Sequence, residues 1–232
     1  MKIKTYFTTL ICAIFIFLII LDSKAGADNK IMPLGDSITW DDRSNDLRDD
    51  GDKIAYRYRL WQLLNAAGYD FDFVGSQYSG FDLFPDAQNE GHPAATDDEI
   101  ADWVYGFLQA NPANIVLLHI GTNDLNPDPT DVKNILDEID RYEANFGVKI
   151  TVILARIINR NCITDQPTSC PESVTTMTFN DNVEAMAFSR VNNSEDPAFP
   201  DKIIFGILDK FFIWKGRCYP RGRLQGLRYS LR

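Results

Sequence analysis

Histidine, basic charge and long apolar runs are all scarce in this chain of 232 residues. Only two residues are histidine, and 33 acidic side chains outnumber 23 basic ones, which gives a formal charge of −10. A negatively charged chain repels a phosphate backbone, so we expect no nucleic-acid partner. No internal repeat or interdomain linker is visible, which excludes solenoid and multi-domain organisations.

The sequence also lacks the residue patterns of a metal site. It has four cysteines, and none of them combines with a second His or Cys pair at zinc-binding spacing. The acidic stretch from Asp41 to Asp52 departs from a calcium-binding loop, because Arg48 and Arg57 stand where the third and twelfth ligands are required. We therefore expect no metal and no cofactor.

Residues 1–27 have the features of a secretory signal peptide. Two lysines precede an apolar run from Tyr6 to Leu21, and small residues follow it at Ala25 and Ala27. We expect cleavage after one of these alanines and a secreted, extracellular protein without a membrane partner after cleavage. The alternative is a retained membrane anchor, although the run of 16 residues is short for a membrane-spanning helix.

Export to an oxidising compartment makes a disulfide between Cys162 and Cys170 plausible. The two cysteines lie eight residues apart in a polar stretch. The alternative is a pair of free thiols in a loop. Cys218 has no evident partner.

Strand-like and helix-like segments alternate after the leader, which is typical of repeated βαβ units. This pattern predicts an α/β domain over residues 28–208, built as a three-layer sandwich on a parallel five-stranded sheet. The expected strands are 30–34, 71–74, 115–120, 149–158 and 202–208, and the expected helices are 56–67, 96–111, 130–146 and 179–191. Thr96 and Glu99 form a capping-box pattern at the start of the second helix.

Three of the loops that follow these strands carry groups suited to acyl transfer. Ser37 follows Gly35 at the end of the first strand and offers a nucleophilic hydroxyl at a helix start. The amide of Gly75 and the side chain of Asn123 follow two further strands and are suited to donate to an oxyanion. Because parallel strands place their carboxyl ends at one edge, we expect these groups to meet there.

These residues resemble the SGNH, or GDSL, hydrolases. The matching blocks are Gly35-Asp36-Ser37, Gly75 and Gly121-Thr122-Asn123-Asp124, and the longer context around them is similar to carbohydrate esterase family three, mainly acetyl xylan esterases. The resemblance implies a flavodoxin-like fold and a carboxylic ester hydrolase. It assigns Ser37 as the nucleophile and the Ser37 amide, the Gly75 amide and the Asn123 side chain as the oxyanion hole.

The family also requires a late Asp-x-x-His block for the general base, and this sequence has none. His119 lies within an expected buried strand, where we interpret it as a core histidine with satisfied hydrogen bonds. His92 lies in a loop and is a candidate for a substitute base; its alternative role is to hold that loop together.

The end of the chain differs from the body in charge. Residues 28–201 contain 12 basic and 31 acidic side chains, whereas residues 202–232 contain 8 basic and 1 acidic. We interpret residues 209–232 as an atypical basic tail that results from a change of reading frame, which would leave the C-terminal part of the fold incomplete. The alternatives are a basic arm for anionic surfaces and a tail folded back on the acidic body.

Taken together, the residues and the resemblance predict a secreted serine esterase whose substrate is acetylated polysaccharide, most closely xylan, or another small acyl ester. Without the base, its activity would be impaired. The alternatives are a lipase-like acyl-ester hydrolase on the same fold and a non-catalytic carbohydrate-binding relic. Trp103 is expected to fill the core, and Trp40 to line the pocket.

Overall fold

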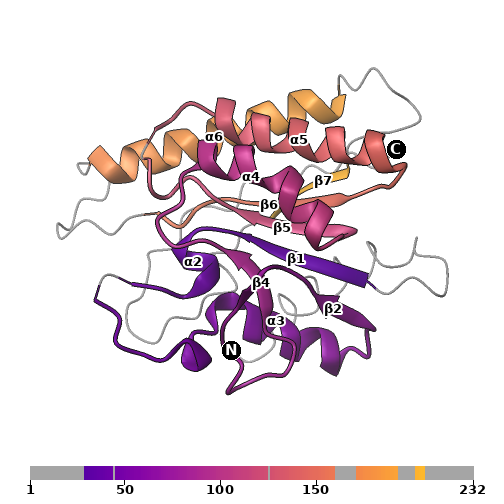
Figure 1. Ribbon diagram of the computed structural model, residues 1–232. Helices are drawn as coiled ribbons and strands as arrows, with labels where there is room; N and C mark the ends of the chain where they lie inside the picture. The colour runs from indigo at the N-terminus through magenta and orange to yellow at the C-terminus, as the bar shows by residue number, and fades with distance from the viewer. Residues whose placement is uncertain (1–28, 44, 125, 160–170, 193–201, 207–232) are drawn as a thin grey trace, which may run out of the picture.

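The computed structural model describes residues 29–43, 45–124, 126–159, 171–192 and 202–206. Helices cover both faces of a central sheet, with α4, α5 and α6 on one face and α2 and α3 on the other (Figure 1). The strands are β1 (Asn29–Gly35), β2 (Phe71–Phe73), β3 (Gln77–Tyr78), β4 (Gln88–Gly91), β5 (Ile115–His119), β6 (Thr151–Ala155) and β7 (Lys202–Gly206). The helices are α2 (Ser37–Trp40), η1 (Asp50–Asp52), α3 (Ala55–Ala66), α4 (Asp97–Ala110), α5 (Thr130–Phe146) and α6 (Pro171–Asn192).

The strand order is β3-β4-β1-β5-β6-β7, and β2 also pairs with β1. All pairings are parallel except the short antiparallel pairing of β3 with β4. The predicted parallel α/β sandwich is therefore confirmed. The β3–β4 hairpin was not predicted, because strands of two and four residues are too short to show a hydrophobic period.

The edge of β1 is shared by two strands placed one after the other. β2 pairs with the first half, where Ile31 lies opposite Phe73, and β4 pairs with the end, where Gly35 lies opposite Gly91. On the other edge, β5 runs beside β1 from Ile31 to Gly35. The residues that follow β4 and β5 thus flank the residues that follow β1.

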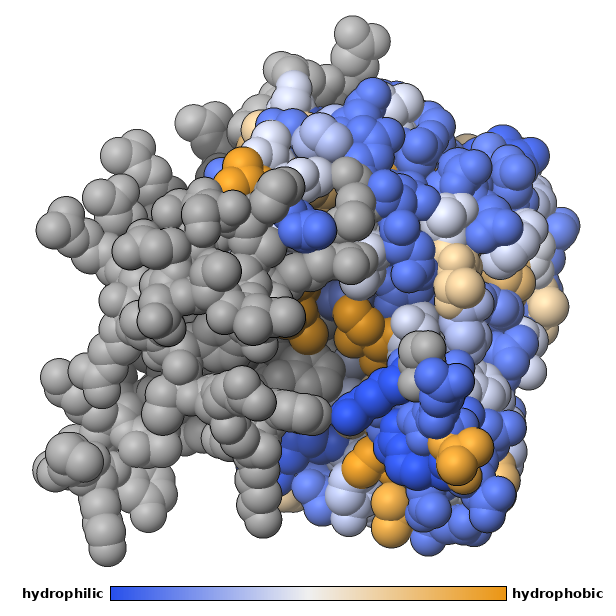
Figure 2. Space-filling view, turned by 90° about the vertical axis from the view of Figure 1, so that its left-hand side faces the viewer, coloured by the Kyte–Doolittle hydropathy of each residue, from blue (hydrophilic) through white to orange (hydrophobic). Residues whose placement is uncertain are grey.

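Apolar side chains fill both layers between sheet and helices. The larger cluster joins the sheet to α4, α5 and α6 and includes Leu34, Val104, Leu118 and Ile135, all without measurable exposure. The smaller cluster, around Phe73 and Leu64, packs α3 on the other face. Burial of this kind stabilises a fold by about 25 cal/mol per Å² of apolar area. On the face seen in Figure 2, the coloured residues are mostly hydrophilic, and the apolar ones lie in small separate groups.

Helix ends agree with the sequence signals. At the start of α4 the Glu99 carboxylate accepts a hydrogen bond from the Thr96 N–H at 3.0 Å, as the capping-box pattern predicts. At the end of α5, Gly147 adopts φ 64°, the left-handed conformation that commonly ends a helix. Within the described residues, no helix is long and apolar enough to cross a membrane.

Two predictions about side chains and boundaries were wrong. Trp103 is 39% exposed rather than part of the core, because it lies at the margin of the apolar stripe of α4. Helix α6 begins at Pro171, eight residues before the expected start, since its first two turns are too polar to show an apolar stripe. The signal peptide, the tail and Cys162 with Cys170 lie outside the described residues.

Candidate active site

Ser37 is the first residue of the one-turn helix α2, directly after β1. Asp36 caps this turn, since its Oδ1 accepts a hydrogen bond from the Ile38 N–H at 2.8 Å. The Asp36 side chain is fully buried, whereas Ser37 is half-buried. The cap therefore fixes the backbone on both sides of a serine that is partly open to solvent.

A close approach between β1 and β5 requires glycine just before this turn. Gly35 lies opposite His119, and a Cβ atom at Gly35 would come within 2.0 Å of the His119 carbonyl oxygen. Only a residue without a side chain fits this position. Each residue of the Gly-Asp-Ser sequence thus has its own role. Gly35 permits the close approach of β1 and β5, Asp36 caps the helical turn, and Ser37 presents a hydroxyl that is partly open to solvent.

A buried guanidinium holds the other end of α2. Arg57 donates to the carbonyl oxygens of Thr39 at 3.0 Å, Ser79 at 2.8 Å and Lys53 at 2.8 Å, and to that of Ala87 at 3.2 Å. Burial lowers the pKa of Arg57 to about 10, so the group remains charged at neutral pH. A cation at the carbonyl end of a helix also favours the helix dipole.

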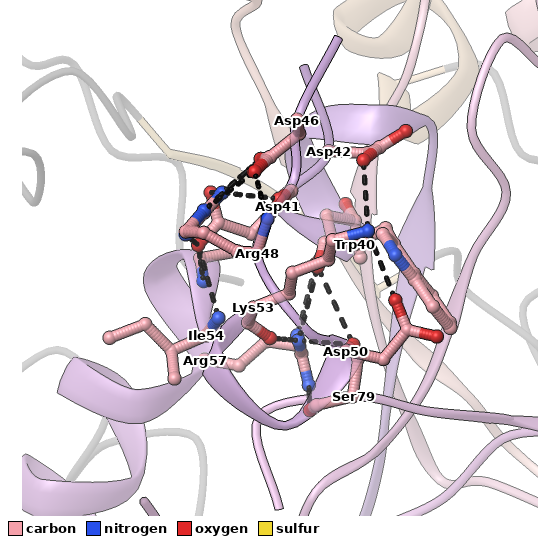
Figure 3. A network of polar contacts seen from close by, with 12 residues as sticks. Trp40, Asp41, Asp42, Asp46, Arg48, Asp50, Lys53, Ile54, Arg57 and Ser79 are labelled. Carbon is pink, nitrogen blue, oxygen red and sulfur yellow. Dashed lines mark hydrogen bonds and ion pairs between the residues drawn. The ribbon is translucent and has the colours of Figure 1, made fainter. Parts of the chain in front are cut away.

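An ion-pair network borders the same turn (Figure 3). Arg48 contacts the carboxylates of Asp41 and Asp46 at 3.0 and 2.5 Å, and Lys53 contacts Asp42 and Asp50, each at 3.0 Å. Burial alone would raise the pKa of Asp41, but hydrogen bonds from Arg48 and from the N–H groups of residues 54 and 55 hold it below its usual value. The acidic stretch therefore forms an internally paired loop beside Ser37.

The turn after β4 brings the Asn123 loop towards β1. The His92 N–H donates to the Gly35 carbonyl at 2.8 Å, and the Asn123 side-chain amide donates to the Ala95 carbonyl at 2.7 Å. Residues 92–95 thus connect the Gly35-Asp36-Ser37 turn with the Asn123 loop, which we expected at the same edge of the sheet. Asn123 retains a second N–H, which is available to another acceptor.

Within this turn, Ala94 adopts φ 68°, an unfavourable conformation for a residue with a side chain. In the part of the chain that the structure describes, no hydrogen bond uses the Ala94 N–H. Strained residues with a free donor often mark functional sites. Sequence reasoning missed Ala94, because an alanine carries no signal of a left-handed conformation.

Gly75 is set back from this edge, so the expectation that it meets Ser37 there was wrong. A Cβ atom at Gly75 would come within 2.1 Å of the Asn89 carbonyl oxygen, and the next residue of β4, Glu90, pairs with Leu34. Gly75 is therefore level with Pro33, two residues before the end of β1, a displacement of roughly 7 Å along the strand. The reason is that β2 pairs with the first half of β1 only.

His92 is held by a buried carboxylate. Its Nε2 atom lies 2.8 Å from Glu90, and the same carboxylate accepts hydrogen bonds from the Ser76 N–H at 2.7 Å and hydroxyl at 2.6 Å. The His92 ring stacks on Phe107 with centroids 4.8 Å apart. Within the described residues no hydrogen bond joins His92 to Ser37, so these contacts match its alternative role of holding the loop.

His119 is buried, as predicted, but the expectation of satisfied hydrogen bonds was wrong. Neither ring nitrogen has a hydrogen-bond partner in the described structure. Burial lowers the pKa of His119 despite the nearby charge of Asp36, which keeps the ring neutral. The nearby Asp36 and Thr39 side chains are buried as fully as the His119 ring.

A pair of carboxyl groups fixes the Asn123 loop to α4. The Asp97 N–H donates to the Asp124 carboxylate at 3.1 Å. Burial raises the pKa of Asp97 to about 8, and the hydrogen bond to Asp124 and its charge add to this effect. Asp98 brings a third carboxylate nearby, and these three are the one such acidic group found in the described residues. When Asp97 is protonated, its carboxyl group can share a hydrogen bond with Asp124, so the two groups need no cation between them.

This pair predicts a pH-dependent stability. In the unfolded chain Asp97 loses its proton near pH 3.8, and in the folded chain near pH 8, so unfolding releases a proton between these values and stability falls as pH rises. Asp97→Asn should remove part of this fall. Melting temperatures measured from pH 4.5 to 8.5 test it, with Asp102→Asn, an exposed carboxylate on the same helix outside this group, as the control. If the melting temperature of Asp97→Asn fell with pH as steeply as that of the parent chain, Asp97 would not be the source of the pH dependence.

Comparison with known proteins places this arrangement in a family. The family model described as GDSL-like lipase/acylhydrolase matches residues 31–197. The chain belongs to the GDSL-like lipase/acylhydrolase family. This membership supports a carboxylic ester hydrolase by family resemblance. The curated proteins gave no significant match.

Solved structures share the fold of this GDSL hydrolase. A Clostridium thermocellum family 3 carbohydrate esterase is 29% identical, with a TM-score of 0.61 over 79% of this chain and 80% of that one. A family 3 carbohydrate esterase from Talaromyces cellulolyticus is 23% identical, with a TM-score of 0.52 over 76% and 77%. The M. smegmatis aryl esterase is 16% identical, with a TM-score of 0.55 over 79% and 85%. The latter two support the fold alone.

Proposed function

We propose that this GDSL hydrolase is a secreted esterase that removes acetyl groups from a polysaccharide, most closely xylan, through an acyl-Ser37 intermediate. The observation that carries the proposal is the meeting of the capped Ser37 turn with the Asn123 loop, through the hydrogen bonds of residues 92–95. The similarity to the Clostridium carbohydrate esterase supports the substrate class.

In this mechanism the Ser37 hydroxyl attacks the ester carbonyl and gives its proton to water, and negative charge develops on the carbonyl oxygen. The bond to the sugar oxygen then breaks, and that oxygen takes up a proton from water and leaves as a hydroxyl group. A further water molecule hydrolyses the acyl-Ser37 ester and releases acetate. The Ser37 N–H at the start of α2 and the second N–H of Asn123 are suited to stabilise the charge on the carbonyl oxygen. The unused N–H of Ala94 takes the role that the resemblance gave to Gly75. Each such donor contributes on the order of 10²-fold to the rate.

We also propose that catalysis is impaired because this sequence contains no Asp-x-x-His block. His92 follows Asn89 and His119 follows Val116 at the required spacing, so neither completes the block. Glu90 occupies one nitrogen of His92, and His119 is fully buried. A site without its general base retains only about 10³- to 10⁴-fold acceleration over water.

Secretion belongs to the same proposal and rests on the pattern of residues 1–27. Intact-mass analysis of the secreted fraction should show a chain that begins after Ala25 or Ala27. A secreted chain that retains Met1 would contradict it.

Acetate release from acetylated xylan and from a small acetyl ester tests the esterase directly. We expect slow release by the purified chain and a fall to the buffer rate in Ser37→Ala, because the acyl intermediate forms on that oxygen. Ser189→Ala, on the exposed face of α6, is the control and should retain the starting rate. Equal rates for the chain and Ser37→Ala would contradict an acyl-Ser37 route.

The two rivals predict different results in the same assay. A lipase-like hydrolase would prefer longer acyl chains to acetyl. A non-catalytic carbohydrate-binding relic would bind xylan without any turnover that depends on Ser37.

A further inference from the structure

One face of the β3–β4 edge presents aromatic and amide side chains in a row that leads to the Ser37 turn. Side chains alternate along a strand, so Gln88 and the buried Glu90 lie on one face of β4, and His92, which follows the strand, is held to Glu90 by a hydrogen bond. Tyr78 lies opposite Gln88 in the antiparallel register and shares this face. Because Gly91 pairs with Gly35, the row ends beside the residues that precede Ser37.

The far end of the row is an exposed pair of parallel rings. Tyr78 and Phe81 stack with centroids 5.1 Å apart and planes inclined by 7°, and they are 51% and 42% exposed. The backbone beneath them is fixed, because Ser79 accepts from Arg57 and Gly80 donates to the Asp50 carbonyl at 2.7 Å. The rings therefore form a rigid apolar surface that no described side chain covers.

The near end of the row is a second aromatic group. Trp103 is exposed rather than part of the core. Its ring meets the His92 ring edge-on, with the centroids 5.7 Å apart. Glu90 and Phe107 hold that ring in place. The exposed amide of Gln88 lies beside Tyr78 at the far end. The four-residue step from Gln88 to His92 corresponds to about 13 Å along an extended strand.

We propose that this row, the β3–β4 strip (Tyr78, Phe81, Gln88, His92 and Trp103), binds the sugar backbone of a neutral polysaccharide and directs its acyl groups to Ser37. A pyranose ring has an apolar C–H face that packs on aromatic rings and hydroxyl groups that pair with amides. The net charge of −10 disfavours a polyanionic chain. The inference rests on the proposed function and adds which surface residues hold the polymer.

Affinity electrophoresis in gels that contain soluble xylan tests the strip without requiring turnover. Xylan should retard the chain, and Tyr78→Ala, Phe81→Ala and Trp103→Ala should each weaken that retardation about tenfold, the effect of one well-packed aromatic group. Tyr78→Phe keeps the ring and should bind normally. Phe146→Ala removes an equally exposed ring at the end of α5 and is the matched control. Thermal melts verify that each variant is folded.

The outcomes separate the strip from the catalytic proposal. Unchanged retardation in the three alanine variants, no retardation of the parent chain, or an equal loss in Phe146→Ala would overturn the strip. Retardation by polygalacturonate as strong as by xylan would overturn the neutral occupant. Hydrolysis of 4-nitrophenyl acetate, compared with Ser37→Ala, reports on the proposed function alone, and the control Phe146→Ala should leave it unchanged.

Discussion

Arg57→Met is expected to lower the free energy of unfolding by about 3 kcal/mol, the upper part of the range found when a buried polar group loses its hydrogen-bond partner. The guanidinium serves the carbonyl oxygens of Thr39, Lys53, Ser79 and Ala87, and methionine would leave these acceptors buried without donors. Each unsatisfied acceptor is costly, although the individual costs do not add. Urea unfolding of the purified chain measures the change.

Arg59→Met supplies the control for this prediction. Arg59 lies on the same helix but is exposed, with Gln62 as its hydrogen-bond partner at 3.3 Å. Its replacement should change stability by less than about 0.5 kcal/mol. If Arg57→Met differed from Arg59→Met by under 1 kcal/mol, the guanidinium would not support the Ser37 turn in the way that its contacts indicate.

Restoring a general base is expected to have the largest effect on activity. In the experiment, the residues after β7 are replaced by the C-terminal segment of the Clostridium thermocellum esterase, whose fold this chain shares. If that segment supplies the Asp-x-x-His block, kcat for a small acetyl ester should rise on the order of 10⁴- to 10⁶-fold, because loss of one triad member costs this much in serine hydrolases.

Two variants of the chimera make this result specific. Ser37→Ala in the chimera should remove the gain, and so should replacement of the introduced histidine by alanine. A folded chimera that hydrolyses the ester no faster than the parent chain would show that the missing base does not limit the reaction.

The sequence predicted the elements with strong local signals. The buried run of β5, the capped start of α4 and the apolar stripe of α5 were all recognisable from spacing alone. The Gly35-Asp36-Ser37 turn followed from its place after a strand. These features depend on neighbours in sequence, so periodicity and capping rules suffice to find them.

Other features depend on register between distant strands, which no local pattern encodes. That β2 stops opposite Ile31, and so leaves Gly75 short of the edge, follows from the arrival of β4 at residues 34 and 35. Arg57 gave no signal at all, because a basic residue on a helix is ordinarily solvated.

The hydrogen bonds from Arg57 to main-chain carbonyl oxygens have a consequence for sequence divergence. Five of its acceptors are main-chain oxygens, which every amino acid supplies, so the side chains at positions 39, 40, 53 and 87 can change without removing an acceptor. Position 57 cannot vary in the same way, because only arginine carries five N–H groups on one planar guanidinium. Related chains that keep this catalytic turn should therefore vary around it while retaining arginine at its centre.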